Sequence, residues 1–493
     1  MPDAPAISDS QRTRINTVLR DRFGHESLRP LQQRIIERLM AGRHALTIMP
    51  TGSGKSLCFQ LPALAMSAPG ITLVFSPLIA LMEDQVAALR ARGIDAVYVN
   101  STLDKKDRLN RYRQIAAGRF DIVYATPERM QKPEFVAALE SVNNNVGGGV
   151  KLLAVDEAHC ISRWGHDLRP AYQLVGRFRK QLGEPVTIAL TATATPECRD
   201  DIKRTLGFDD ESMPTFSSPI NRPNLSIESR EVWDDDDKLR HIGAVADAMP
   251  GTGIVYFSLI KDLDRFADLL RRRTDRPIAI YHGRLDPAQK KRVYRRFIDA
   301  PPEDNLLLLA TNAFGMGVDK PDIRFIIHAQ LPGSLESYYQ EIGRAGRDGL
   351  PALCALLYSA DDLAIQHRFV EWANPSADLL VRIATAAEES AHEDFDEDEL
   401  RLAALGKGGD GGRLQHCVIT LEKLGVFEAT PFPDRWRLAR PLDHSEIDPD
   451  EIEAKTRRDL QRLLNVVELT RAEDPRRLIL DYFSLDDQIT AQG

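Results

Sequence analysis

Short apolar runs alternate with helical stretches from about residue 40 to residue 360. Ten such runs occur, and in chain order they read HALTIM, ITLVFS, DIVYAT, KLLAVD, VTIAL, GIVYFS, PIAIYH, NLLLLA, RFIIHA and LCALLYS. Each run is too continuously apolar to leave one face of a strand in water. Such strands alternating with helices predict an α/β fold, in which parallel sheets are covered by helices.

The ten predicted strands are too many for one doubly wound sheet of ordinary size. Residues 208–224, FDDESMPTFSSPINRPN, supply turn formers and have no apolar periodicity. We therefore predict two α/β lobes in tandem, at residues 1–215 and 216–360.

The pattern changes after Ser359, where the strand runs stop. Linker helices are expected at 361–394, and the charged run HEDFDED is read as the solvated start of a helix. Next, RLQHCVITLEKLGVF has the period of an amphipathic helix, and VFEATPFPDRWRLA predicts a hairpin with a proline-containing turn. A helix followed by a hairpin predicts a small winged-helix-like domain at 395–445. Residues 446–493 predict a pair of helices broken at Asp474-Pro475.

Composition excludes several classes of protein. A chain of 493 residues with 43% hydrophobic and 28% charged residues is long enough for several full cores. No apolar run reaches the roughly 18 residues of a membrane-spanning helix. The net charge of −9 gives no basic surplus, although a local basic groove is compatible with it. The N-terminus has no apolar signal core, so a reducing cytosolic (cytoplasmic) location is expected, and we expect a monomer.

The cysteines are too dispersed for a metal or disulfide framework. They lie at positions 58, 160, 198, 354 and 417, none within three residues of another. This spacing argues against a zinc knuckle, a redox pair and a set of disulfides.

The strongest local signal is MPTGSGKS at 49–56, directly after one predicted strand and before a helix. Glycines allow backbone N–H groups to close around phosphates, Lys55 neutralises phosphate charge, and the Ser56 hydroxyl reaches Mg²⁺. The usual pattern opens with glycine, and Met49 stands there instead.

A second element lies about 100 residues further on. Asp156 and Glu157 end the apolar strand LLAV. An acid at the carboxyl end of a buried strand can hold Mg²⁺, and a neighbouring acid can polarise an attacking water.

The second lobe has no phosphate loop, but it carries Arg344 and Arg347 in QEIGRAGRDG. Arginines three apart lie on one helix face or in one tight loop. Their guanidinium groups can reach a γ-phosphate across a cleft and stabilise its charge in the transition state.

Taken together, these stretches resemble the RecQ family of superfamily-two DNA helicases, in order from about residue 15 to residue 358. The resemblance rests on eight stretches: FGHESLRPLQQ (23–33), MPTGSGKS (49–56), SPLIALMEDQV (76–86), ATPERM (125–130), DEAHCISRWGHDLRPAY (156–172), LTATAT (190–195), ATNAFGMGVDKPDIR (310–324) and QEIGRAGRDG (340–349). It implies two RecA-like lobes, ATP and Mg²⁺ as cofactors, single-stranded and tailed duplex DNA as partners, and roles in DNA repair and recombination.

The resemblance implies an ATP site built from both lobes. The implied nucleotide-binding residues are His25, Arg29, Gln32, Thr51, Gly52, Ser53, Gly54, Lys55, Ser56 and Asp319. The implied catalytic residues are Lys55, Asp156, Glu157, Gln340, Arg344 and Arg347. Ser56 and Asp156 are expected on Mg²⁺, Glu157 on the attacking water and Arg347 on the γ-phosphate. Thr191 and Thr193 are expected to couple hydrolysis to lobe movement.

The same resemblance implies a track for one DNA strand. Its residues are Ser76, Pro77, Thr126, Arg129, Trp164, His166, Arg169 and Thr311. Trp164, His166 and Arg169 would form an aromatic-rich loop that senses single-stranded DNA. We also hypothesise that an aromatic of the predicted hairpin, Phe427, Phe432 or Trp436, separates the strands, with Phe432 as the first choice.

The chain departs from the family after the second lobe. Many members continue with a four-cysteine zinc module, but Pro475 stands where the first of those cysteines would be. No structural zinc site is therefore expected. Leu168 also replaces an aromatic of the sensing loop.

Three functions stay open at this point. The first is an ATP-dependent helicase that moves 3′ to 5′, with the polarity taken from the family. The second is a DNA-stimulated ATPase that translocates without separating strands, and the third is a DNA-binding scaffold with a vestigial motor. RNA is also an open substrate, because a motor that grips phosphates has limited means to reject 2′-hydroxyls.

Overall fold

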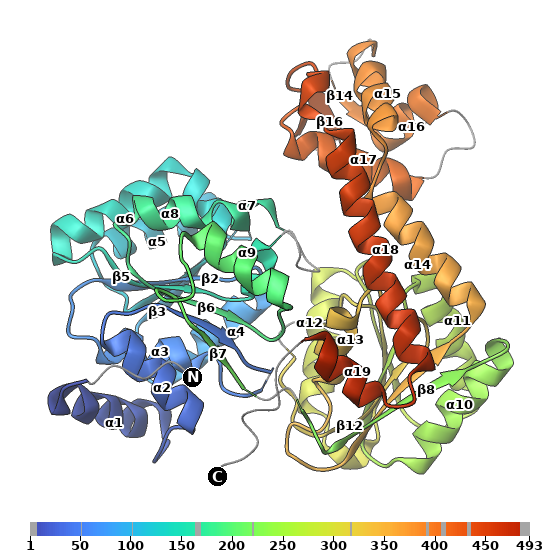
Figure 1. Cartoon of the computed structure of the whole chain (residues 1–493), viewed down its shortest axis with the longest axis horizontal. Coiled ribbons are helices and arrows are strands. Elements are labelled where there is room, and N and C mark those ends of the chain that lie inside the picture. The colour runs from blue at the N-terminus through green and yellow to red at the C-terminus, as the bar shows by residue number, and fades with distance from the viewer. Residues whose placement is uncertain are drawn as a thin grey trace.

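The structure of the protein is a computed structural model. It describes residues 7–50, 52–100, 102–162, 169–218, 221–315, 318–390, 394–405, 411–430 and 435–483. In Figure 1 two α/β lobes lie side by side, and a helical arm rises from the second lobe to a small domain.

The first lobe is built on a seven-stranded sheet in the order β3-β4-β2-β5-β6-β1-β7. Every strand pair in it is parallel. The strands are β1 (Ala45–Ile48), β2 (Ile71–Phe75), β3 (Ala96–Val99), β4 (Ile122–Ala125), β5 (Val150–Val155), β6 (Val186–Thr191) and β7 (Thr215–Ser217). Parallel strands need crossover connections, and the helices that provide them cover both faces of the sheet.

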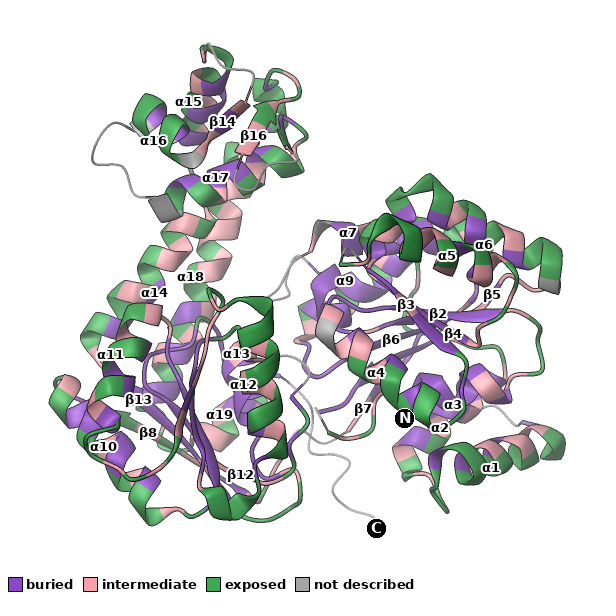
Figure 2. Cartoon of the chain, turned by 180° about the vertical axis from the view of Figure 1, so that it is seen from behind, coloured by how far each residue is buried: buried purple, intermediate pink, exposed green. Residues whose placement is uncertain are grey.

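Two hydrophobic cores lie on the two faces of this sheet. One face is covered by α1 (Asp9–Phe23), α2 (Pro30–Met40), α3 (Leu57–Ala65) and α4 (Ile79–Ala91). The other is covered by α5 (Lys105–Ala116), α6 (Pro133–Val146), α7 (Pro170–Gln173), α8 (Val175–Gln181) and α9 (Pro196–Leu206). The strands are buried between these layers, while the outer faces of the helices are exposed (Figure 2).

The second lobe has a six-stranded sheet in the order β10-β11-β9-β12-β13-β8, again parallel throughout. The strands are β8 (Leu225–Glu231), β9 (Thr252–Tyr256), β10 (Ile278–Tyr281), β11 (Leu307–Ala310), β12 (Ile323–His328) and β13 (Ala352–Tyr358). One face packs against α10 (Asp235–Ala248) and α11 (Ile260–Leu270). The other packs against α12 (Pro287–Asp299), α13 (Leu335–Ile342) and two C-terminal helices.

These two lobes confirm the α/β prediction. All ten predicted strands form, and the structure adds three to them, β3, β7 and β8. Strand β7 has three residues and lies within the turn-rich segment 208–224, so the first sheet reaches Ser217. Strand β8 lies at the edge of its sheet, and its buried or half-buried residues alternate with exposed ones, a pattern unlike the continuous apolar runs used for prediction.

The small domain has the element order of a winged helix. It consists of α15 (Ala377–Glu388), β14 (Asp394–Asp396), α16 (Glu397–Leu405), α17 (Gly411–Lys423), β15 (Phe427–Ala429) and β16 (Arg435–Leu438). Its antiparallel sheet has the order β14-β16-β15, and β15 and β16 form the predicted hairpin. Helix α15 contributes Leu379, Leu380 and Ile383 to the core of this domain. The helix predicted at HEDFDED begins at Glu397, but β14 precedes it directly.

The small domain is inserted into a helical arm. Helix α14 (Ala360–Ala373) leads from the second lobe to it, α18 (Pro449–Arg471) returns, and α19 (Pro475–Tyr482) docks on the lobe. The chain breaks between α18 and α19 at Asp474-Pro475, as predicted. Val466, Leu469, Ile479 and Phe483 complete the core of the second lobe.

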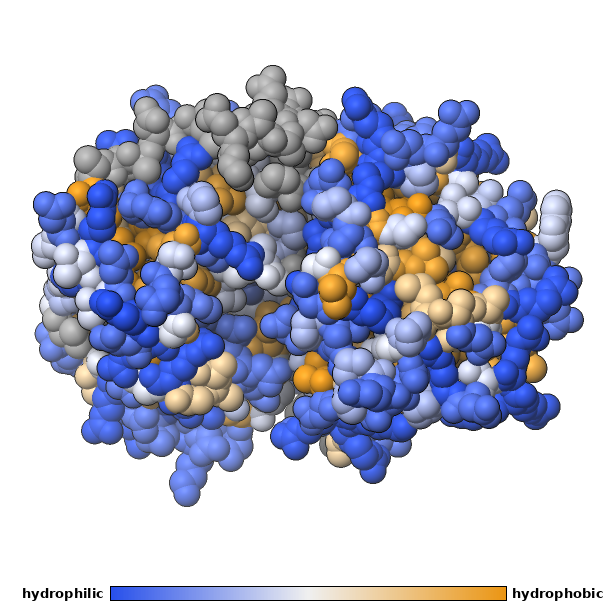
Figure 3. Space-filling view, turned by 90° about the horizontal axis from the view of Figure 1, so that it is seen from below, coloured by the Kyte–Doolittle hydropathy of each residue, from blue (hydrophilic) through white to orange (hydrophobic). Residues whose placement is uncertain are grey.

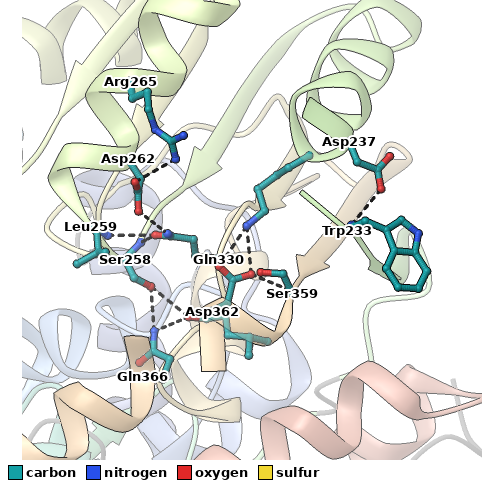
Figure 4. Close-up of polar contacts among 12 residues, drawn as sticks. Trp233, Asp237, Ser258, Leu259, Asp262, Arg265, Gln330, Ser359, Asp362 and Gln366 are labelled. Carbon is teal, nitrogen blue, oxygen red and sulfur yellow. Dashed lines mark hydrogen bonds and ion pairs between the residues drawn. The ribbon is translucent and has the colours of Figure 1, made fainter. Parts of the chain in front are cut away.

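A buried polar network, which we call the arm clamp, fastens α14 to the second lobe (Figure 4). The clamp consists of Lys238, Ser258, Gln330, Asp362 and Gln366. Both carboxylate oxygens of Asp362 lie 3.1 Å from the Lys238 ammonium, and the two side chains are only 3% and 6% exposed. Burial raises the pKa of Asp362, and the Lys238 charge opposes that rise.

The rest of the clamp joins α14 to the strand ends. Gln366 donates to the Ser258 hydroxyl at 2.9 Å and to the Leu331 carbonyl at 2.5 Å. The Gln330 side chain accepts from the backbone N–H groups of Ser258 and Leu259, at 2.8 and 3.1 Å. The arm is thereby tied to the carboxyl ends of β9 and β12.

Breaking the buried pair in the clamp should destabilise the second lobe. Lys238→Met would leave the Asp362 carboxylate buried without its partner, which is expected to lower the free energy of unfolding by about 3–5 kcal/mol. The double variant Lys238→Met/Asp362→Leu should lose much less, because no isolated charge remains. Urea unfolding checks both variants, with Arg457→Ala at the exposed Glu453–Arg457 pair as the control. Equal losses of unfolding free energy in the single and double variants would show that an isolated buried charge at Asp362 is not the cause.

Candidate nucleotide site and nucleic-acid track

The loop at 49–56 joins β1 to α3, so it lies at the carboxyl end of a strand that is flanked by β6 and β7. Gly52 and Gly54 have φ values of +80° and +84°. Only glycine adopts this left-handed region freely. Lys55 and Ser56 follow immediately before the N-terminus of α3, where backbone N–H groups and the helix dipole favour an anion.

The predicted acidic pair lies close to this loop in the fold. Asp156 follows β5, which the sheet separates from β1 by one strand. Burial, followed by the charge of Glu157, raises the pKa of Asp156 to about 7, and Lys55 opposes that rise. Glu157 adopts a left-handed backbone with φ 49°, a sparsely populated conformation for a non-glycine residue.

A histidine that we did not predict lies between the acidic pair and the next strand. The Nδ1 atom of His159 is 3.3 Å from Glu157 Oε2 and 3.0 Å from Thr191 Oγ1. The Thr191 hydroxyl donates to the Thr193 carbonyl at 2.9 Å. His159 thus links the predicted catalytic acid to the LTATAT stretch. In the sequence, the only indication of this role was that His159 lies three residues after Asp156.

Both predicted arginines lie in the tight turn that follows α13, on the second lobe. Arg344 is 2% exposed, and the Arg347 side chain is 5% exposed. Arg347 donates to the Val318 carbonyl at 2.6 Å and to Asp319 Oδ1 at 2.7 Å. Asp319 therefore orients Arg347, although its own side chain is largely exposed.

The two lobes meet at this point. A Cβ atom at Gly52 would lie 3.0 Å from Cδ of Arg347, so the arginine of one lobe lies against the phosphate loop of the other. Burial, followed by the charge of Arg344, lowers the pKa of Arg347.

The donors at this junction fit a polyphosphate with Mg²⁺. Among the described residues, Lys55 Nζ, Arg344 Nε, and Nε and Nη2 of Arg347 are buried without a hydrogen-bond partner. Buried cationic donors are costly unless an anion pairs with them. Asp156 supplies the oxygen ligand that Mg²⁺ prefers, and Ser56 lies at the helix start. Lys55, Ser56, Asp156, Arg344 and Arg347 are thus suited to hold ATP with its Mg²⁺.

The three residues expected at the adenine differ in their surroundings. His25 is exposed in the connection between α1 and α2. Arg29 donates to the Ser53 carbonyl at 3.1 Å, and Gln32 donates to the carbonyls of Ser53 and Gly54 at 3.2 and 3.3 Å. Arg29 and Gln32 therefore support the phosphate loop directly, which the sequence pattern did not predict. Gln340 is half-buried in α13, before the two arginines.

Four of the residues predicted to bind DNA lie at the carboxyl edges of the two sheets. Ser76 and Pro77 follow β2, Thr126 follows β4 and Thr311 follows β11. Arg129 lies just after Thr126 in a short 3-10 helix, Pro127–Gln131. The structure also joins two of the predicted residues, since Arg169 donates to the Pro77 carbonyl at 3.0 Å.

Some predictions fall outside the described residues. Thr51, Trp164, His166 and Phe432 are in this group. Of the other two wedge candidates, Phe427 is 2% exposed and packs its ring 5.0 Å from that of Phe395. Phe427 belongs to the core of the small domain, so its proposed role as a wedge was wrong. Trp436 is half-buried against the same core.

The described part of the chain has neither a candidate metal cluster nor a helix suited to a membrane. No group of three or more His, Cys, Asp or Glu side chains there is arranged to hold a metal ion. No helix there is both long and apolar enough to cross a membrane. The face seen from below is largely hydrophilic, with apolar residues showing between polar ones on both sides (Figure 3).

Two parallel-sheet lobes, with a phosphate loop on one and buried arginines facing it from the other, define a helicase-type motor. The family described as DEAD/DEAH box helicase matches residues 29–201, and the one described as helicase conserved C-terminal domain matches residues 237–349.

The relatives narrow this class. The chain is 42% identical over 361 residues to the ATP-dependent DNA helicase RecQ of Bacillus subtilis (strain 168), covering 73% of this chain and 58% of that protein. It is 37% identical over 397 residues to the probable ATP-dependent DNA helicase RecS of the same organism, covering 80% and 77%. The chain belongs to the RecQ family of DNA helicases. It spans little more than half the length of several of its curated relatives.

Solved structures share the fold at low sequence identity. The helicase MrfA bound to DNA matches with a TM-score of 0.57 and 18% identity, covering 91% of this chain and 66% of that one. Dbp5 of S. cerevisiae, bound to RNA and ADP BeF3, matches with a TM-score of 0.54 and 16% identity, covering 74% and 92%.

A side chain at Gly52 should damage the junction between the lobes. Gly52→Ala strains a backbone at φ +80° and places Cβ 3.0 Å from Arg347 Cδ, so ATP hydrolysis is expected to fall about tenfold or more. Gly42→Ala is the matched control, because Gly42 has φ +75° but nothing lies within 4 Å of its would-be Cβ. Steady-state ATPase assays check the pair. Equal activity in the two variants would exclude the contact with Arg347 as the cause.

Proposed function

We propose that the chain is an ATP-dependent DNA helicase of RecQ type that moves 3′ to 5′ along one strand and separates duplex DNA. The observation that carries this proposal is the approach of Arg347 to Gly52, because one nucleotide bound there touches both lobes. A ligand that binds the closed arrangement better than the open one drives closure. Relatives named as ATP-dependent DNA helicases support the choice of DNA.

The chemistry assigned to this chain is phosphoryl transfer to water. Lys55, Ser56 and the loop backbone would hold the phosphates, and Glu157 would orient the attacking water. Ser56 and Asp156 would hold the Mg²⁺ that is bound with ATP, and this ion would neutralise phosphate charge. Arg344 and Arg347 would stabilise the charge that develops in the transition state, while Gln340 lies on the same helix end.

We assign the DNA track to the carboxyl edges of the sheets. Ser76, Thr126 and Thr311 end strands in both lobes, so one strand crossing these edges would contact both halves of the motor. Contacts to phosphates make such binding sensitive to salt and largely independent of sequence. Trp164, His166 and Phe432 keep the roles predicted for them. A cytosolic location and a monomeric state also remain predictions.

Strand separation on tailed duplexes tests the proposal. A duplex with a 3′ single-stranded tail should be unwound with ATP and Mg²⁺, and the same duplex with a 5′ tail should not. Hydrolysis stimulated by DNA without separation would favour the translocase. Unwinding of the 5′-tailed duplex alone would overturn the polarity, and equal use of an RNA tail would widen the substrate.

Lys55→Ala should abolish hydrolysis and leave DNA binding mostly intact. The lysine neutralises phosphate charge, and its ammonium is buried at the loop rather than on the strand track. ATPase assays and fluorescence anisotropy with a single-stranded oligonucleotide measure the two properties. Lys106→Ala, at an exposed lysine of α5, is the control. Retained turnover in Lys55→Ala would exclude this ATP site.

A further inference from the structure

Arg199 makes a contact between the lobes that lies outside the ATP site. It lies on α9 of the first lobe, and its Nε donates to the Ala194 carbonyl at 3.2 Å. One Nη of the same guanidinium donates to the Phe483 carbonyl at 2.6 Å. Phe483 caps the C-terminus of α19, which is docked on the second lobe.

The Phe483 side of this contact is fixed to α13. Phe483 is fully buried, with its ring 5.5 Å from that of Tyr339. The neighbouring Tyr482 hydroxyl donates to Glu336 at 2.8 Å. Both partners belong to α13, the helix that leads into the turn with Arg344 and Arg347. A force on the end of α19 therefore reaches the element that carries the predicted arginine fingers.

The Ala194 side leads to the catalytic acid. Ala194 follows Thr193, whose carbonyl accepts from the Thr191 hydroxyl. Thr191 in turn lies 3.0 Å from His159, and His159 lies 3.3 Å from Glu157. A series of close approaches through His159 and Thr191 therefore leads from Glu157 to the loop that Arg199 holds.

We propose that Arg199 is a positioning residue that couples the ATP site to the C-terminal arm, by holding the LTATAT loop of one lobe against the end of α19 on the other. The inference rests on the proposed function, because it concerns how ATP hydrolysis moves the arm. Arg199 touches neither the phosphate loop nor the predicted strand track in the described contacts.

The chemistry of both partners favours arginine at this position. The last carbonyls of a helix carry partial negative charge, which a cation stabilises. The planar guanidinium offers several donors in a fixed fork, so it can hold two carbonyls at once, whereas a lysine ammonium binds as a compact point charge. Burial lowers the pKa of Arg199, in agreement with a contact shielded from solvent.

The contact also explains how movement could reach the small domain. Helix α19 follows α18 after the break at Asp474-Pro475, and α18 carries the small domain at its far end. With the lobes held together at Arg199, closure at Gly52 and Arg347 becomes a rotation about this contact, and the arm turns with the second lobe that carries it. Without Arg199 the arm still follows the second lobe, but the rotation no longer has a fixed pivot at the end of α19.

The first experiment separates coupling from hydrolysis. In Arg199→Met the KM for ATP should stay unchanged, and the number of base pairs separated per ATP hydrolysed should fall about tenfold. In Arg199→Lys the number of base pairs separated per ATP should lie between the values of Arg199→Met and the wild type. The control is Arg204→Ala, an exposed arginine on the same helix whose ion pair with Asp201 stays within the first lobe. Wild-type yield per ATP in Arg199→Met would overturn the proposal.

A double-variant cycle tests whether the contacts form one chain. Tyr482→Phe removes the hydrogen bond to Glu336 on the lobe-two side and should also lower the yield per ATP. Combined with Arg199→Met it should add little, because residues of one network are not additive. Fully additive losses of base pairs separated per ATP would show that Arg199 and Tyr482 do not act through one network.

Hydrogen exchange tests the contact without relying on activity. The amides of residues 479–483 should exchange at least about tenfold faster in Arg199→Met than in the wild type and in Arg204→Ala. Unchanged exchange would overturn the contact. If the wild type unwinds no duplex, the proposed function fails, and fast exchange in Arg199→Met would still establish the bridge between the lobes.

Discussion

The structure depends on positive charge that is buried at the junction of the lobes. Lys55 approaches from the first lobe and Arg344 and Arg347 from the second, and all three carry buried donors without partners in the described part of the chain. An anion shared by these donors would offset the cost of their burial, so a polyphosphate favours closure of the lobes. The two lobes supply these cations from opposite sides of the site.

Parallel sheets also bring the other predicted site residues together. In such a sheet all strands point the same way, so residues that end different strands share one edge. The phosphate loop follows β1, Asp156 follows β5, and the residues predicted to line the DNA track follow β2, β4 and β11. This is why the α/β fold, both lobes and the grouping of site residues could be predicted from the sequence. Each apolar run marks a strand, and the polar residue that ends the run marks the edge.

The sequence could not reveal contacts between distant segments. Arg199 and Phe483 are 284 positions apart, and each looks ordinary in its own helix. The support that Arg29 and Gln32 give to the loop carbonyls is likewise invisible to a motif that assigns them to adenine. For Phe427 the sequence suggested a functional role where the structure shows a core residue. An aromatic residue at the base of a hairpin can pack in a core or contact a ligand, and the local sequence does not distinguish the two. Short or half-buried strands such as β7 and β8 were missed because they lack a continuous apolar run.

The arm shows how a domain can be added to a motor without loosening it. Helices α14 and α18 run out and back side by side, tied by contacts such as Asn374 to Asp459 at 2.9 Å and Lys455 to Asn374 at 2.7 Å. A domain held by two helices packed side by side resists bending better than a domain on a single linker. At its base the arm clamp fixes α14 to the ends of β9 and β12, while α19 fixes the returning chain to α13. Both anchors are on the second lobe, so the small domain is expected to move with that lobe. In our proposal, the first lobe acts on the end of the arm through the hydrogen bond from Arg199 to the Phe483 carbonyl.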